Sequence, residues 1–128
     1  MPCQSILIIE DDESIRETLK LFLEIEGYSV LTAENGKEAL NMLAGRRQLC
    51  LILVDLMMPV MDGWQFVEAA GADRDLAATP IVVVTAFAER ASGIRARAIL
   101  KKPVDLDFLL RMVREYCGPA VVAPAAAS

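Results

Sequence analysis

Short apolar runs alternate along the chain with longer stretches in which apolar residues recur every three or four positions. Uninterrupted apolar runs are typical of strands that a parallel sheet buries on both faces, and the longer spacing is typical of amphipathic helices. The predicted strands are Ser5–Glu10, Ser29–Ala33, the run that starts at Leu49, Ile81–Thr85 and Ala98–Lys101. The predicted helices are Glu13–Glu26, Gly36–Ala44, Trp64–Gly71 and Leu106–Cys117. This alternation indicates an α/β domain with right-handed crossovers between parallel strands.

A fourth crossover helix is expected between Phe87 and Arg97. The span is short and contains Ser92-Gly93, so we expect this helix to be truncated or irregular. Residues 1–118 then form one domain, and the Ala- and Pro-rich residues 119–128 are predicted to be a disordered tail or the remnant of a linker.

The central predicted strand ends in an acid. Asp55 follows the apolar run, and Pro59 and Asp62-Gly63 turn the chain shortly after it. This order places Asp55 at the carboxyl edge of the sheet, where open α/β sheets bind their ligands. The alternative is that Asp55 only caps a turn.

A second acidic cluster, Glu10-Asp11-Asp12-Glu13, follows the first strand. If the two strands are neighbours, their carboxylates meet at one edge and repel one another unless a cation joins them. Oxygen ligands around a small open site suit Mg²⁺. We assign Glu10 and Asp11 to the metal, and Asp12 and Glu13 to the N-cap and first turn of a helix.

The chain resembles the receiver domain of two-component response regulators over residues 5–117. Four motifs carry the resemblance, in matching order: Ile6–Asp12, Val54–Pro59 with Asp62-Gly63, Val84-Thr85-Ala86, and Lys102-Pro103. It implies a flavodoxin-like, three-layer, doubly wound fold with five parallel strands in the order 2-1-3-4-5. The acidic residues would meet at the switch point between strands 1 and 3.

The resemblance also assigns the site. It implies that Asp55 is the phosphoacceptor, that the Thr85 hydroxyl donates to a phosphoryl oxygen, and that Lys102 pairs with Asp55. Lys102 is chosen over Lys101 because the family's active lysine directly precedes proline, in a cis peptide bond.

The implied cofactor is Mg²⁺. Its ligands would be Glu10, Asp11, Asp55 and the main-chain carbonyl of Met57. Glu10 stands where the family more often has Asp, and its longer side chain suits a contact through water.

The function implied is that of a signalling module. Asp55 would take a phosphoryl group from a sensor histidine kinase or a phosphotransfer protein, and the phosphorylated domain would act on a downstream protein. Such a domain catalyses only its own phosphotransfer and dephosphorylation, so we do not expect an enzyme that turns over other substrates.

One position departs from the family. Receivers usually place an aromatic residue three positions before the active lysine, and here that residue is Ile99. Ile99 and the short fourth helix favour an alternative, a docking module that keeps the fold but works without phosphorylation. A metal-dependent phosphatase with an Asp nucleophile is disfavoured, because its second acid would fall at Met57.

Composition excludes several other classes. The chain has 128 residues and a net charge of −5, which argues against direct nucleic acid binding. It contains no histidine, which rules out histidine-based triads. Its apolar runs are too short to cross a membrane, and no nucleotide-binding fingerprint occurs. Cys3, Cys50 and Cys117 are odd in number and far apart, with no zinc spacing, and Cys50 is interpreted as a small core residue. A reducing cytoplasm is the predicted location.

Overall fold

A five-stranded parallel sheet forms the centre of the protein. The computed structural model describes residues 5–44 and 48–120. The strands are β1 (Ser5–Ile9), β2 (Ser29–Ala33), β3 (Leu51–Val54), β4 (Ile81–Thr85) and β5 (Ala98–Lys101). They lie in the order β2-β1-β3-β4-β5, as the resemblance implied, and every neighbouring pair is parallel.

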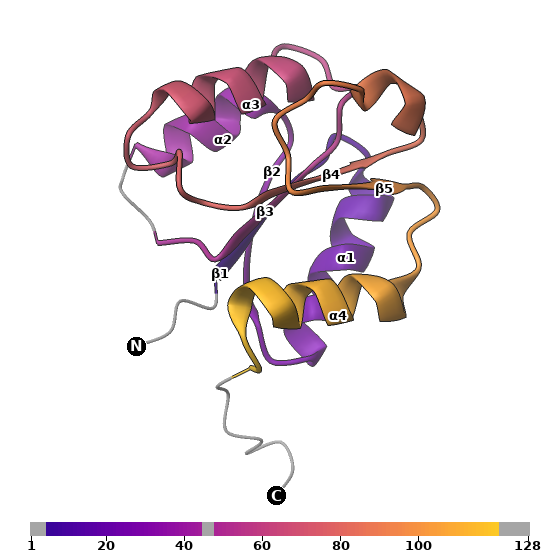
Figure 1. Ribbon diagram of the computed structural model, residues 1–128. Helices are drawn as coiled ribbons and strands as arrows, with labels where there is room; N and C mark the ends of the chain where they lie inside the picture. The colour runs from indigo at the N-terminus through magenta and orange to yellow at the C-terminus, as the bar shows by residue number, and fades with distance from the viewer. Residues whose placement is uncertain (1–4, 45–47, 121–128) are drawn as a thin grey trace, which may run out of the picture.

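Helices cover both faces of the sheet and make three layers (Figure 1). They are α1 (Glu13–Ile25), α2 (Gly36–Leu43), α3 (Gly63–Ala72) and α4 (Leu106–Cys117). Helices α2 and α3 lie on one face, and α1 and α4 lie on the other. This doubly wound arrangement follows from right-handed crossovers that run in opposite directions from the centre of the sheet.

Alternate residues of the buried strands supply two separate cores. Leu7, Ile52 and Val54 point toward α2 and α3, where they pack with Phe66. The second core lies on the α1 and α4 side. It contains the alternate residues of β1 and β3, Ile6, Ile8, Leu51 and Leu53, together with Leu23 and Leu109. The central strands therefore read as unbroken apolar runs because both of their faces are covered.

Each α-helix begins at a side chain that accepts a hydrogen bond from a backbone N–H group. The capping residues are Asp12, Asn35, Asp62 and Asp105. In each case the donor lies three residues further along, so one otherwise unpaired N–H group of the first turn is satisfied. The predicted N-cap role of Asp12 is confirmed.

The connection from β4 to β5 holds no α-helix. Its regular part is the 3₁₀ turn η1 (Ala88–Ala91), after which Gly93 adopts a left-handed conformation with φ of 84°. Only 12 residues separate the two strands, too few for a crossover that both reaches the parallel neighbour and contains a full helix. We expected a truncated or irregular helix here, and the structure contains only a 3₁₀ turn.

The cysteines differ from expectation. The structure joins Cys50, just before β3, to Cys117, the last residue of α4, in a disulfide with a Cα–Cα distance of 5.2 Å. Cys50 is a buried core residue, as interpreted, but its bond to Cys117 was not predicted, because 67 positions of sequence separation concealed a contact that the doubly wound topology creates.

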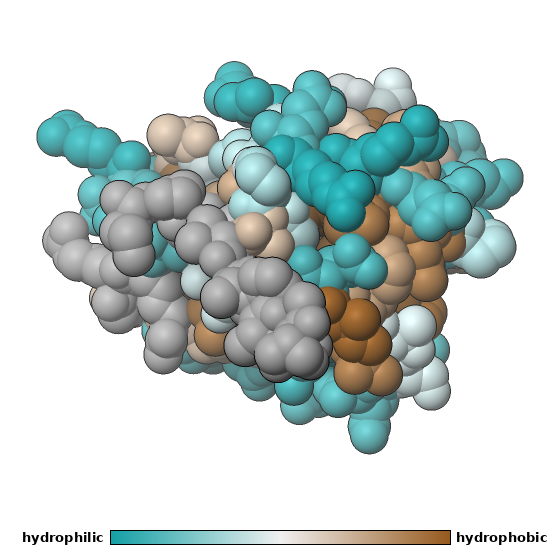
Figure 2. Space-filling model, turned by 90° about the horizontal axis from the view of Figure 1, so that it is seen from below, coloured by the Kyte–Doolittle hydropathy of each residue, from teal (hydrophilic) through white to brown (hydrophobic). Residues whose placement is uncertain are grey.

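The outer surface carries some apolar side chains on the side of α1 and α4. Leu21 and Ile25 on α1 and Phe108 on α4 are exposed, and Figure 2 shows apolar surface among hydrophilic side chains on the face seen from below. Within residues 5–44 and 48–120, none of the helices is long and apolar enough to cross a membrane. Of the predicted tail, residues 121–128 lie outside the described part of the chain.

Candidate phosphoacceptor site

The carboxyl ends of β1 and β3 bring two acidic segments together. The register pairs Ile9 with Val54, so Glu10 and Asp55 are the next residues of two adjacent strands. The Asp55 N–H group still donates to the Ile9 carbonyl at 3.1 Å, which fixes the acceptor segment against β1. The switch point between strands 1 and 3 thus holds the acids that the sequence placed there.

Three carboxylates converge at this edge. One oxygen each of Glu10, Asp11 and Asp55 lies within 4.8 Å of the other two, close enough for a single cation to contact all three. Glu10 and Asp55 are buried, with 3% and 7% of their surface exposed, whereas Asp11 faces solvent. The set is a hard-oxygen site with one open side, the arrangement that Mg²⁺ occupies while keeping several waters.

Lys102 bridges the two buried acids. Its Nζ donates to Glu10 Oε1 at 2.5 Å and to Asp55 Oδ2 at 3.1 Å. The cis peptide bond between Lys102 and Pro103, which the resemblance implied, follows directly after β5. Lys102 holds this place in part through its backbone N–H, which donates to the Thr85 carbonyl at 2.9 Å.

The pKa values of two groups are raised, for different reasons. Removal from water raises the pKa of the Glu10 carboxyl to about 7, although the hydrogen bond from Lys102 opposes this change. Burial alone would lower the pKa of Lys102, but hydrogen bonds to Glu10 and Asp55 outweigh it and raise that pKa. Lys102 is therefore firmly a cation, and Glu10 is the group of the cluster that exchanges its proton near neutral pH.

Thr85 ends β4 and is fully buried. Its Oγ1 accepts a hydrogen bond from the Phe87 N–H group at 3.1 Å. Because a hydroxyl can accept and donate at the same time, Thr85 keeps a donor for an anionic group at the sheet edge. The neighbouring Phe87 ring is exposed and lies under the guanidinium of Arg90, 4.9 Å from the ring centroid.

Met57 lies two residues after Asp55, beside its side chain. Its N–H group is 3.5 Å from Asp55 Oδ1, and its side chain is exposed. Because the side chain points to solvent, any contribution of Met57 to the site would come from its main chain.

Two further residues support the site, and sequence reasoning gave neither of them a role there. Arg16, in the first half of α1, donates from Nη1 to the Glu10 carbonyl at 2.9 Å. Gly63 packs so closely that an added Cβ would lie 2.4 Å from the Asp55 carbonyl oxygen. The Asp62-Gly63 turn is a visible signal, but only the folded structure shows that the glycine touches the backbone of the acceptor.

An apolar cavity of about 460 Å³ opens next to this site. It lies between α1 and the connection from β5 to α4, and its walls include Ile15, Leu19, Pro103 and Leu106 together with Lys102. A protein that approached Asp55 from this side would find apolar surface beside the buried charges.

Comparisons with known proteins agree with this geometry. The chain matches the family model of the response regulator receiver domain over residues 6–114. It is 42% identical over 115 residues to the response regulator MprA of Mycobacterium tuberculosis (strain H37Rv), covering 85% of this chain but 48% of MprA. The chain thus spans about half the length of that relative.

Two solved structures are similar in fold and contain Mg²⁺ according to their descriptions. One is the response regulator TrrA of Thermotoga maritima in complex with Mg²⁺-BeF, at a TM-score of 0.79 and 29% identity, covering 88% of this chain and 98% of TrrA. The other is the receiver domain of the sensor histidine kinase PA1611 of Pseudomonas aeruginosa, at 0.79 and 26%, covering 91% and 98%. The acidic cluster, the four matched motifs and the family match over nearly the whole fold lead to one conclusion: the chain belongs to the response regulator receiver family.

Proposed function

We propose that this receiver accepts a phosphoryl group on Asp55 from the phosphohistidine of a sensor histidine kinase or a phosphotransfer protein. The observation that carries the proposal is the contact of Lys102 Nζ with Asp55 Oδ2 at 3.1 Å, inside a cluster of three carboxylates. A buried carboxylate beside a fixed ammonium group and a cation site has the parts that phosphoryl transfer needs, namely a positioned acceptor and nearby positive charge.

In the proposed reaction an Asp55 oxygen attacks the phosphorus of the donor's phosphohistidine. The new P–O bond forms as the P–N bond breaks, and the electron pair of the broken bond stays on the imidazole, which takes a proton from water. Lys102 shifts its contact toward the phosphoryl oxygens, and Thr85 donates its hydroxyl proton to one of them. The product is an aspartyl phosphate, a covalent intermediate of the kind that carboxylate nucleophiles form.

Glu10, Asp11, Asp55 and the Met57 carbonyl would hold Mg²⁺. The three carboxylate oxygens lie within 4.8 Å of one another, which fits one small cation. When bound, the cation supplies positive charge that offsets the negative charge of the phosphoryl group.

We further propose that the chain turns over no other substrate and catalyses only the gain and loss of its own phosphoryl group. The site offers no histidine and no base aimed at a second substrate, so decay of the acyl phosphate depends on water that enters past Met57 and Phe87. A cytoplasmic location is part of the proposal, because the phosphohistidine donor is made from ATP. The downstream partner is a protein and not a nucleic acid.

Intact mass after incubation with acetyl phosphate and Mg²⁺ tests the proposal. We expect the parent to gain one phosphoryl group, Asp55→Asn to gain none, and EDTA to prevent the gain. Labelling of Asp55→Asn at the parent's rate would overturn the assignment of the acceptor.

A second function, docking without phosphorylation, rests on Ile99 and on the missing crossover helix. Ile99 is exposed at the position where receivers usually carry an aromatic switch residue, and η1 replaces the helix beside it. An unlabelled parent that also fails to bind Mg²⁺ would favour this function over phosphoryl transfer.

A further inference from the structure

The missing crossover helix leaves one side of α3 uncovered. Two open cavities, of about 360 and 510 Å³, lie between α3 and the chain that leads from η1 into β5. Both are lined by Val67, Gly71 and Arg95, so they are neighbours along α3, and together they are called the α3 groove. It is separate from the carboxylate cluster, whose residues line neither cavity.

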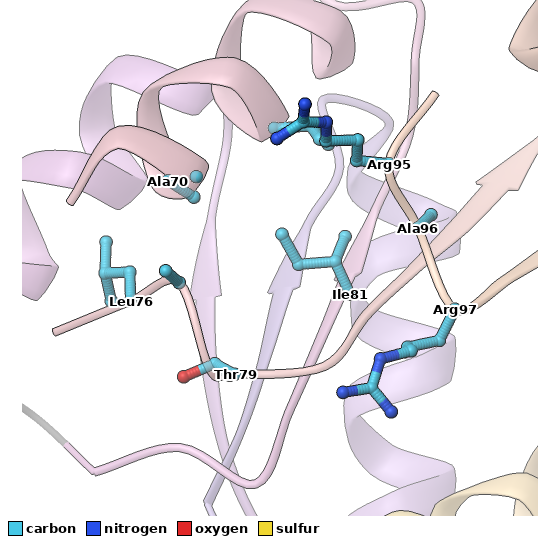
Figure 3. Close-up of a pocket in the computed structure, with 10 residues that line it drawn as sticks. Ala70, Leu76, Thr79, Ile81, Arg95, Ala96 and Arg97 are labelled. Atoms are coloured by element: carbon cyan, nitrogen blue, oxygen red, sulfur yellow. The ribbon is translucent and has the colours of Figure 1, made fainter. Parts of the chain in front are cut away.

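The floor of the α3 groove is apolar. Figure 3 shows Ile81 and Ala70 inside the groove, with Leu76 on one side and Ala96 on the other. Trp64, the only tryptophan of the chain, lines the other cavity. An added Cβ at Gly71 would meet nothing within 4 Å, so the groove is open near the C-terminal end of α3.

The rim of the α3 groove is basic. Arg95 and Arg97 are both exposed and line the same cavity, and Figure 3 shows Arg95 extending toward the helix that carries Ala70 while Arg97 extends to the other side of Ile81. The ion pairs of the described residues involve neither arginine. Glu68 is the one acid in the lining.

This basic character is local. The charged residues that line the groove are two arginines and one acid, Glu68, although acids outnumber bases by 18 to 13 in the whole chain. The groove is thus a positively charged region of a negatively charged protein, and it attracts an acidic partner.

The two arginines extend to opposite sides of the apolar floor. Arg95 extends toward the helix that carries Ala70, and Arg97 extends to the other side of Ile81 (Figure 3). A helix that lies across the floor can therefore present an acid at each of its edges, one to each arginine, while its apolar face covers Ile81 and Ala70.

From this combination of an apolar floor, two unpaired arginines and the space of an absent helix, we propose that the α3 groove binds an acidic amphipathic helix of a partner protein. The partner helix packs where a crossover helix would otherwise lie. Binding depends on the groove and not on Asp55, so the proposal holds whether or not the chain is phosphorylated.

Fluorescence of Trp64 provides a direct test. The probe is a designed 18-residue helical peptide with a leucine and alanine face flanked by glutamates four residues apart; the matched control peptide has lysine in place of each glutamate. We expect the acidic peptide to shift the Trp64 emission in a saturable way, and the basic peptide to have no effect. A peptide with proline at its centre should bind at least tenfold more weakly, because proline breaks the helix.

Four variants locate the binding. Gly71→Leu adds a side chain to the wall of the groove, at a position where a Cβ would meet nothing within 4 Å, and should weaken binding at least tenfold. The double variant R95E/R97E should lose the acidic peptide and gain the basic one. K37E/R111E, which makes the same change of charge at exposed residues of α2 and α4, should bind as the parent does, as should Asp55→Asn. Circular dichroism confirms that each variant is folded.

Several results would overturn the proposal. They are the absence of saturation up to about 1 mM peptide, equal binding of the acidic and basic peptides, and full binding by Gly71→Leu. Sedimentation that shows a dimer of the parent and a monomer of Gly71→Leu would also overturn it, because the occupant would then be a second copy of the chain.

Discussion

At the scale of single residues, Lys102 sets the charge balance of the site. One ammonium group contacts both buried carboxylates, which are also two of the three groups that could hold a metal ion. In the proposed reaction Lys102 therefore supports the transfer of a phosphoryl group and also competes with the cation. These two roles can be separated by experiment.

Lys102→Ala should bind Mg²⁺ more tightly and accept a phosphoryl group more slowly. Without the ammonium group, the Glu10 and Asp55 oxygens lose their positive partner and therefore bind a cation more strongly. Asp55 also loses a fixed positive charge, which lowers the rate of phosphoryl transfer on the order of 10²-fold. Calorimetric titration of Mg²⁺ and the time course of labelling measure the two effects. Lys101→Ala, the exposed neighbour, is the matched control and should behave as the parent does. An unchanged labelling rate in Lys102→Ala would contradict the role given to Lys102.

Glu10 should make stability depend on pH. Its pKa is raised from 4.5 to about 7 in the folded protein, so between these values the folded state holds a proton that the unfolded chain releases. The free energy of unfolding should fall as pH rises through this window, by up to about 3 kcal/mol, and then level off. Urea unfolding at a series of pH values in EDTA measures the slope.

Glu10→Gln is the control for this pH dependence, because it cannot titrate. The slope between pH 4.5 and 7 should be smaller in this variant than in the parent, and an equal slope would assign the effect to other groups. Mg²⁺ needs the ionised carboxylate, so its affinity for the parent should rise through the same window.

The sequence was sufficient to find residues whose chemistry is unusual for their place. An acid that ends a buried apolar run, as Glu10 and Asp55 do, stands out in the chain, and a parallel sheet brings such ends together. Arg16 and Gly63 did not stand out, because each acts on the backbone of a neighbouring segment, and a backbone contact leaves no pattern in the side chains.

At the scale of elements, α3 contains two glycines in opposite surroundings. A Cβ on Gly63 would lie 2.4 Å from the Asp55 carbonyl oxygen and 2.8 Å from the Leu56 Cα atom, and both of these are backbone atoms. A Cβ on Gly71 would meet no atom within 4 Å. The same substitution at the two positions therefore separates close packing from helix propensity.

Gly63→Ala should destabilise the protein by about 1–3 kcal/mol and slow phosphorylation, because the acceptor segment must move away from α3. Gly71→Ala should leave phosphorylation unchanged and stabilise by up to about 1 kcal/mol, since alanine is the better helix former. Chemical denaturation and labelling of both variants provide the comparison. Equal effects of the two substitutions would show that Gly63 is not needed for the close approach to Asp55.

The elements were predicted well where the apolar period was clear. The bounds of β2, β4, β5 and α4 agree with the sequence, whereas β1 ends one residue early and β3 starts two residues late. The predicted short helix between β4 and β5 is only the 3₁₀ turn η1. The number of residues between the two strands, rather than local helix propensity, decides what can form there.

At the scale of the whole molecule, the Cys50–Cys117 disulfide joins the middle of the sheet to the last helix. Tyr28 adds a second tie at this end, since its hydroxyl donates to the Gly118 carbonyl at 2.6 Å. Each contact joins two residues that are far apart in the sequence, so it closes a large loop. Together they hold the C-terminal helix against the α1 side of the sheet. Reducing conditions would remove the covalent tie and leave only the noncovalent one.

Reduction should therefore lower the free energy of unfolding of the parent. A bond that closes a loop across 67 positions contributes roughly 4 kcal/mol when its effect is to restrict the unfolded chain. Urea unfolding with and without a phosphine reductant should show this loss in the parent and in Cys3→Ser, and no response to reductant in C50A/C117A. If the reductant leaves the parent's midpoint unchanged, the two thiols are not bonded in solution, and apolar packing of α4 through Leu109 and Val113, together with the Tyr28 hydrogen bond, holds that helix to the sheet.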